Sequence, residues 1–271
     1  MPVKPPEDFR VLIVYPNLPL MLVPSLAIAL FTARLKKQGY QVELFETTHY
    51  LSDEVSSSTN RVEILNVRDF DMTDDLNITI RKDMYGDFRK RVEDFEPDFL
   101  IYSVVEDVFL QTLNLVRAIE DLDIPSLVGG VFPTYAPQRC IEPDEIRLVG
   151  HGEGENTVVR VAEAIRTGGA LHDIPGTWFK DDDQTIYKNP KDPLVKLDET
   201  LPDFSLFEES RFNRPMGGRV FKMIPVETYR GYPFACTYCN SPAQREYAKV
   251  EGLGNFLRRK SLKTVRTELR H

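Results

Sequence analysis

Short apolar runs alternate with segments of helical periodicity from residue 10 to residue 169, and this alternation limits the fold more than any other feature. The runs RVLIVY, QVELFE, DFLIYS, SLVGG and IRLVG are typical of buried strands. The segments between them end in basic residues or glycine, as helices do. Strands that alternate with helices form a parallel sheet with helices on both faces. The sequence therefore predicts a doubly wound α/β fold.

The loops that follow the predicted strands are the candidate binding regions, because doubly wound sheets bind ligands at the carboxyl ends of their strands. Four loops are in question: YPNLPLMLVP, SVVED, GGVFPTYAP and HGEGEN. The first contains no glycine, which argues against a dinucleotide fingerprint. Gly129 and Gly130 would let a flat or bulky ligand approach the backbone, or they would only make a turn, and the pattern favours neither.

Composition narrows the class of protein. The 271 residues carry a net charge of −8, so we expect no nucleic-acid partner. No run of 18 apolar residues occurs and the N-terminus lacks an apolar signal core, so we expect a cytoplasmic protein without a membrane partner. Two of the three cysteines form a CxxC pair, which in such a protein favours metal or redox chemistry over disulfides.

The pattern changes after residue 175. Residues 176–219 form a looser stretch with short strand-like runs and many prolines, which we interpret as a linker. Residues 220–271 begin with a new apolar run, VFKMIPVET, continue into the stretch ETYRGYPFACTYCNSP and end in a predicted helix. We therefore expect three parts, 1–175, 176–219 and 220–271.

The loop residues, taken in order, resemble a known family. They are Ser103, Val105, Gly129, Gly130, Thr134 and the GEGE stretch at residues 152–155. This pattern resembles the flavodoxin-like (Rossmann-like) cobalamin-binding domain that precedes a radical S-adenosylmethionine (SAM) barrel of the TIM type, and the CxxC stretch resembles the cluster loop of that barrel. The resemblance covers essentially the whole chain. It implies that residues 1–175 bind cobalamin and that residues 220–271 are the first βα unit of the barrel.

The resemblance also implies roles for individual residues. Ser103, Val105, Gly129, Gly130 and Thr134 would surround the corrin and its nucleotide tail. Family members that ligate cobalt through histidine carry Asp-x-His-x-x-Gly in the first loop, and this chain has no histidine there. His151 is the one histidine in the four loops, and we interpret it as a surface or turn residue rather than a cobalt ligand. Phe132 replaces a frequent family histidine and would pack on the corrin or fill the core.

The cysteine stretch departs from the family pattern at one position. By resemblance, Cys236 and Cys239 would ligate a 4Fe–4S cluster and Tyr238 would lie beside the adenine of SAM. Tyr232 occupies the place of the third cysteine, and a phenol is a hard oxygen ligand that is mostly protonated at neutral pH. Cys140 could substitute for the missing thiolate, although a lone cysteine in this context is more typical of a packing residue.

The implied activity is SAM cleavage at the cluster followed by radical methyl transfer or a related C–H functionalisation of an unknown small-molecule substrate. A complete barrel needs on the order of 200 residues, so we expect the chain to be a fragment. Because Tyr232 replaces a cysteine, the alternative is that the chain is degenerate at the cluster. One alternative is a non-enzymatic cobalamin-binding or sensing module with an inert barrel remnant. Another is a two-cysteine structural zinc site, although four ligands are usual.

Overall fold

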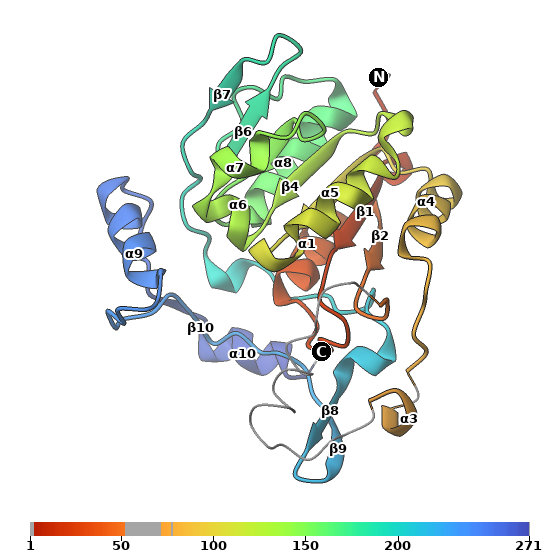
Figure 1. Ribbon diagram of the computed structural model, residues 1–271. Helices are drawn as coiled ribbons and strands as arrows, with labels where there is room; N and C mark the ends of the chain where they lie inside the picture. The colour runs from red at the N-terminus through yellow and green to blue at the C-terminus, as the bar shows by residue number, and fades with distance from the viewer. Residues whose placement is uncertain (1–2, 52–71, 77, 271) are drawn as a thin grey trace.

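The computed structural model describes residues 3–51, 72–76 and 78–270, and its main feature is a seven-stranded sheet in the order β2-β1-β3-β4-β5-β6-β7 (Figure 1). The parallel strands are β1 (Arg10–Tyr15), β2 (Gln41–Glu46), β3 (Phe99–Ser103), β4 (Ser126–Gly129) and β5 (Leu148–Gly150). Their order, 2-1-3-4-5, is that of flavodoxin-like sheets. The predicted fold class is confirmed.

Two layers of helices cover the parallel strands (Figure 1). On one face lie α1 (Leu26–Lys37) and α8 (Gly154–Thr167). On the other lie α4 (Met84–Phe95), α5 (Phe109–Arg117), α6 (Val131–Tyr135) and α7 (Pro137–Ile141). Alternate residues of β1 enter the two cores, with Leu12 on the α5 side and Ile13 on the α1 side. Burial on both faces explains why the strands are continuous apolar runs in the sequence.

The stretch interpreted as a linker contributes more order than the sequence suggested. It extends the sheet with two antiparallel strands, β6 (Thr177–Lys180) on β5 and β7 (Ile186–Lys188) on β6. The excursion expected at residues 51 to about 83 lies mostly outside the described residues, and its described part holds the short helix α3 (Met72–Leu76). Short 3-10 helices occur at Pro6–Asp8, Glu106–Val108, Glu120–Leu122, Leu197–Glu199 and Glu209–Phe212.

The chain from residue 213 onward, which includes the end of the stretch interpreted as a linker, lies at the carboxyl edge of the sheet (Figure 1). Its elements are β8 (Asn213–Met216), β9 (Arg219–Lys222), β10 (Tyr229–Arg230), α9 (Ser241–Val250), β11 (Arg258–Arg259) and α10 (Leu262–Glu268). The strand expected from Val220 is β9, but it pairs antiparallel with β8, and β10 pairs antiparallel with β11. The C-terminal helix lies where the sequence predicts it, whereas α9 was not predicted.

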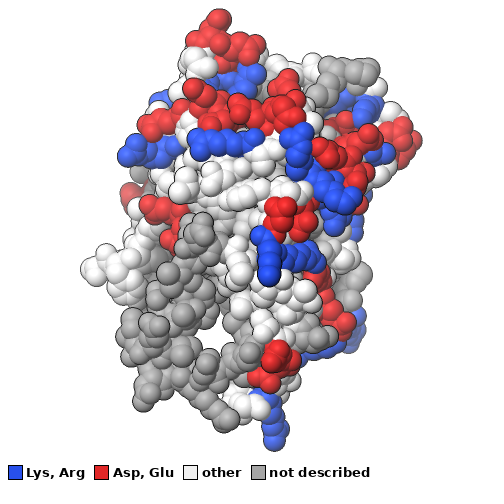
Figure 2. Space-filling model, turned by 45° about the vertical axis from the view of Figure 1, so that its right-hand side comes forward, with Lys and Arg blue, Asp and Glu red and all other residues white. Residues whose placement is uncertain are grey.

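The surface carries both signs of charge. On the face shown in Figure 2, acidic and basic side chains alternate across the upper part of the molecule. Many of them form ion pairs within or between neighbouring helices, as Lys90 does with Asp94 and Arg89 with Asp121. Within the described part of the chain, no helix is long and apolar enough to cross a membrane.

Candidate functional site

A cavity of about 580 Å³ opens at the carboxyl edge of the sheet. It lies where the strand order reverses between β1 and β3, which is the usual ligand position in doubly wound sheets. The predicted residues Ser103, Val105, Gly129, Gly130 and Thr134 all line it. The structure thus brings together five positions that come from two separate loops.

The two adjacent glycines have different structural roles. A Cβ atom on Gly130 would lie 2.5 Å from the Val104 carbonyl oxygen, and the residue has a φ of +119°, so the loop itself requires glycine here. A Cβ atom on Gly129 would find its nearest neighbours at 3.9 and 4.0 Å, which is ordinary contact. Gly129 therefore leaves space that a ligand can fill, whereas Gly130 is required by the conformation of its own loop, which has no room for a side chain.

The Thr134 hydroxyl joins the two loops that border the cavity. It donates a hydrogen bond to the Gly130 carbonyl oxygen (2.7 Å) and accepts one from the Gly152 amide (3.0 Å). Thr134 thereby fixes the loop after β4 against the loop after β5. Its hydroxyl is already used within the protein, so we expect a ligand contact to be an addition to this role.

The inner part of the cavity reaches between the sheet and the helices α1 and α8. Its wall is mainly apolar and includes Leu30, Ile101, Leu127 and Val158. Two buried polar atoms at this wall, Thr157 Oγ1 and Asp192 Oδ2, have no hydrogen-bond partner among the described residues. Since buried polar groups normally find partners, these atoms suit a ligand that carries hydrogen-bonding groups into an apolar slot.

His151 lines the cavity and lies in the loop after β5, as expected of a turn residue, but it is buried rather than at the surface. Its Nε2 lies 3.0 Å from the Asn189 carbonyl oxygen, an acceptor, so Nε2 carries the proton and donates it. The ring packs edge-on against Trp178 at 6.1 Å. Burial lowers the pKa of His151 to about 4, and it is therefore neutral at physiological pH.

The low pKa of His151 predicts a pH dependence of stability. Between pH 6.5 and about 4 the unfolded chain binds a proton at this position that the folded chain does not, so stability is full above pH 6.5 and falls as the pH falls through this window. The shift corresponds to about 3 kcal/mol. His151→Gln keeps a donor toward the Asn189 carbonyl oxygen but does not titrate. We therefore expect the free energy of unfolding of this variant, measured in urea at several pH values, to lose the part of its pH dependence that His151 contributes. Equal slopes in both proteins would contradict the assignment.

The outer wall of the cavity comes from residues far along the chain. Glu227, Arg230, Gln244 and Tyr247 all line it. These residues precede and follow the two cysteines in the chain, and Cys236 and Cys239 themselves are not among the lining residues. The segments on both sides of the CxxC pair therefore border the same cavity as the predicted loop residues.

The two cysteines lie in one tight loop, in which the Cys239 amide donates to the Cys236 carbonyl oxygen (3.1 Å). The proximity of Cys236 raises the pKa of the Tyr232 phenol. Tyr238 is 91% exposed. Among the described residues, no group of three or more His, Cys, Asp or Glu side chains could hold a metal ion. The residues present do not fit a cluster held by three thiolates.

Cys140 does not compensate for the missing thiolate. It is fully buried on α7, inside the core between the sheet and the helices α4 and α5. Burial raises the pKa of its thiol to about 12. Cys140 is therefore a packing residue, as the sequence favoured. Phe132 likewise packs on Phe109, with ring centroids 5.1 Å apart.

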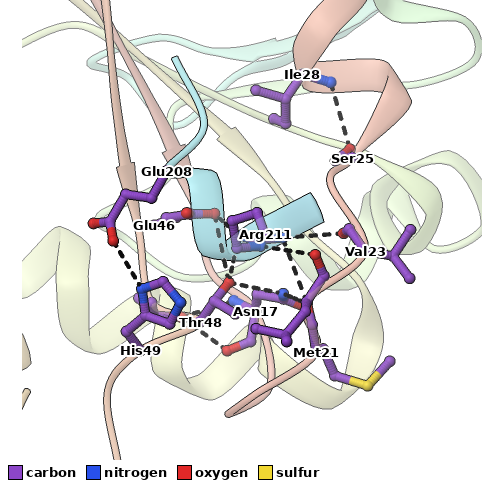
Figure 3. Close-up of polar contacts among 12 residues, drawn as sticks. Asn17, Met21, Val23, Ser25, Ile28, Glu46, Thr48, His49, Glu208 and Arg211 are labelled. Carbon is purple, nitrogen blue, oxygen red and sulfur yellow. Dashed lines mark hydrogen bonds and ion pairs between the residues drawn. The ribbon is translucent and has the colours of Figure 1, made fainter. Parts of the chain in front are cut away.

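A buried arginine holds the loop between β1 and α1 in place (Figure 3). Arg211 has no exposed surface, and it pairs with Glu46 at the end of β2. Its guanidinium donates to Thr48 Oγ1 (2.7 Å) and to the carbonyl oxygens of Leu22 (3.1 Å) and Val23 (3.0 Å). Arg211 thus joins the linker to the loop between β1 and α1.

The comparisons with known proteins agree with this geometry. The fold and the cavity define a doubly wound α/β domain with a ligand site at its topological switch point. A model of the B12 binding domain matches residues 21–162, more than half of the chain. The chain belongs to the B12-binding domain family.

Solved structures share the fold. A cobalamin-dependent SAM radical enzyme, OxsB, superposes with a TM-score of 0.65 at 18% identity, over 97% of this chain and 31% of that one. The radical SAM methyltransferase TsrM from Kitasatospora setae gives 0.60 at 18% identity, over 96% and 45%. These superpositions confirm the predicted fold.

Curated relatives are longer than this chain. Cytidylyl-2-hydroxyethylphosphonate methyltransferase of Streptomyces wedmorensis is 22% identical over 90% of this chain and 47% of its own length. An uncharacterized methyltransferase of Pyrococcus horikoshii is 24% identical over 59% of this chain and 35% of its own. The chain spans less than half the length of these relatives.

Proposed function

We propose that this chain binds cobalamin in the cavity at the carboxyl edge of the sheet and is the cobalamin-binding part of a radical SAM protein of the methyltransferase type. The observation that carries the proposal is that one cavity is lined both by Gly129 and the other loop residues at the strand ends and by the segments on either side of the CxxC pair. The membership in the B12-binding family and the methyltransferase names of the relatives support it.

The protein's own residues would hold and orient the cofactor. Gly129 leaves room for the approach of a bulky ring, and Ser103 and Val105 would line that approach. The apolar slot between α1 and α8 suits the nucleotide tail, since Thr157 Oγ1 and Asp192 Oδ2 lack hydrogen-bond partners there among the described residues, while Asp192 Oδ1 pairs with Arg160 (2.7 Å). Bound cobalamin supplies a cobalt centre that can carry a methyl group. The loop between β1 and α1 contains no histidine, so we expect binding without a histidine ligand to cobalt.

A second function is favoured by one residue. Tyr232 stands where the family has a cysteine, and the residues around it do not complete a three-thiolate site. The chain would then be a cobalamin-binding or sensing module whose cysteine stretch carries out no SAM chemistry. Under the methyltransferase-type proposal, Cys236 and Cys239 would hold the cluster and Tyr238 would lie beside SAM.

Metal content separates these functions. After anaerobic reconstitution with cobalamin, iron and sulfide, we expect about one cobalt per chain and iron well below the ~4 per chain of a full cluster. Tyr232→Cys should raise iron clearly, because it restores three thiolates at family spacing. Phe234→Cys is the matched control, since it adds a thiol to the same exposed loop at the wrong position and should leave iron unchanged.

Three results would change the conclusion. Absence of cobalamin uptake by the folded chain would exclude the first proposal. About four irons in the unmutated chain, with no effect of Tyr232→Cys, would make Tyr232 or another residue a true ligand. Stoichiometric zinc in the protein as isolated would favour a structural metal site at the two cysteines.

A further inference from the structure

An ion-pair cluster joins the GEGE stretch to the residue just before the CxxC loop. Arg230 Nη1 lies 2.6 Å from Glu155 Oε1 and 3.3 Å from Glu153 Oε1. Its Nε and Nη2 donate to the two oxygens of Glu227 at 2.8 and 3.0 Å. The side chains are 22% exposed for Arg230, 7% for Glu155 and 13% for Glu227. This is a largely desolvated cluster, in which removal of one member leaves its partners uncompensated.

A second arginine reaches the same carboxylates from the neighbouring strand. Arg258 is paired with Arg230 across the β10–β11 ladder. Its guanidinium makes two hydrogen bonds to Glu153, at 2.5 and 2.8 Å, and one to the Val195 carbonyl oxygen at 2.7 Å. Burial opposes ionisation of Glu153, but the two arginines outweigh it and hold the pKa of this carboxyl below its ordinary value. The short ladder thus presents two cations to the acidic first turn of α8.

The chain after Arg230 is held tightly. Gly231 follows with a φ of +93°, and a Cβ atom there would lie 2.2 Å from the Phe256 carbonyl oxygen. The backbone therefore passes against residue 256 directly before it enters the CxxC loop. Gly231 therefore fixes the backbone one residue after Arg230 and five residues before Cys236.

We propose that Arg230 is a positioning residue, which fixes the segment that leads into the CxxC loop at the rim of the cavity by bridging Glu155 and Glu227. Glu153, Glu155, Glu227 and Arg230 all line the cavity, so the same contacts close its outer wall. The wall therefore retains a ligand as well as placing the segment that leads into the CxxC loop. The ligand-retention part rests on the proposed cobalamin function, whereas the positioning part does not.

Hydrogen exchange tests the positioning part on the full chain without ligand. In Arg230→Gln, amides of residues 229–260 should exchange about tenfold faster or more, while those of β1 and β3 keep the wild-type rate. Arg230→Lys keeps the charge but cannot bridge Glu155 and Glu227 with a fork of donors, so we expect an intermediate rate. Arg259→Gln is the matched control, because Arg259 is exposed on the adjacent position of β11.

Cobalamin release tests the retention part. We expect release from Arg230→Gln to be about tenfold faster than from wild type and from Arg259→Gln, and a Glu155→Gln/Arg230→Gln double variant to add little further. If exchange and release in Arg230→Gln match the control, the proposal is wrong. If the wild-type chain takes up no cobalamin, the proposed function fails, and the exchange rates alone decide the role of Arg230.

Discussion

Gly129→Leu should abolish cobalamin binding and leave the fold intact. The Cβ atom fits beside the Gly150 and Tyr102 carbonyl oxygens at 3.9 and 4.0 Å, and the rest of the leucine side chain would enter the cavity. Filling the space of a bulky ligand costs several kcal/mol of binding energy, so we expect affinity to fall at least about 100-fold. Spectroscopic titration with cobalamin measures this loss, and the melting temperature should stay within about 5 °C of wild type.

Gly130→Ala separates the effect on the ligand from the effect on the loop. Its single methyl group would meet the Val104 carbonyl oxygen at 2.5 Å and would force alanine into a φ of +119°. We expect this variant to be less stable by about 2–3 kcal/mol even without ligand. A Gly129→Leu protein that binds cobalamin normally would show that the corrin does not approach this strand end.

Arg211→Leu should cause the largest loss of stability. The substitution leaves Glu46 buried without its cation and frees the carbonyl oxygens of Leu22 and Val23 (Figure 3). Removing one partner of a buried ion pair typically costs about 3–5 kcal/mol. Urea unfolding of the variant measures this loss.

Two further variants test whether the loss of stability in Arg211→Leu comes from the buried charge of Glu46. Arg139→Leu breaks an exposed pair with Glu142 and should cost less than about 1 kcal/mol. The double variant Arg211→Leu/Glu46→Leu removes the stranded charge and should recover part of the loss. A loss below about 1 kcal/mol in Arg211→Leu would mean that other contacts hold the loop between β1 and α1.

The parallel strands could be predicted because both faces of the sheet are buried. Runs such as RVLIVY need apolar residues at every position, and this signature does not depend on distant contacts. The antiparallel strands β6 and β7 were expected as short strand-like runs, but they are short and only partly buried, so the sequence did not show that they extend the sheet rather than belong to a linker. The pairing of β9 with β8 likewise depends on a turn at Gly217 and Gly218 that the apolar pattern did not reveal.

The loop residues of the site could be predicted because glycines and hydroxyls mark strand ends in the sequence. The roles of these residues could not be predicted, because only the structure shows that the loop conformation requires Gly130 and that Gly129 leaves space for a ligand. Glu153 and Glu155 lay in a stretch already noted, but their partners Arg230 and Arg258 are more than 70 residues away. Nothing in the sequence indicates that Arg211 is buried, because its hydrogen-bond acceptors are mostly backbone carbonyl oxygens.

The cavity is built from segments that leave the ribosome at very different times. Most of its floor and inner slot has been made by the end of α8, whereas Asp192 and the wall formed by Glu227, Arg230 and Tyr247 come later. During synthesis the floor is therefore open on one side for as long as the intervening residues are being added. A large ligand can enter from that side and be enclosed afterwards, which makes loading of the nascent chain a kinetic alternative to opening the finished protein.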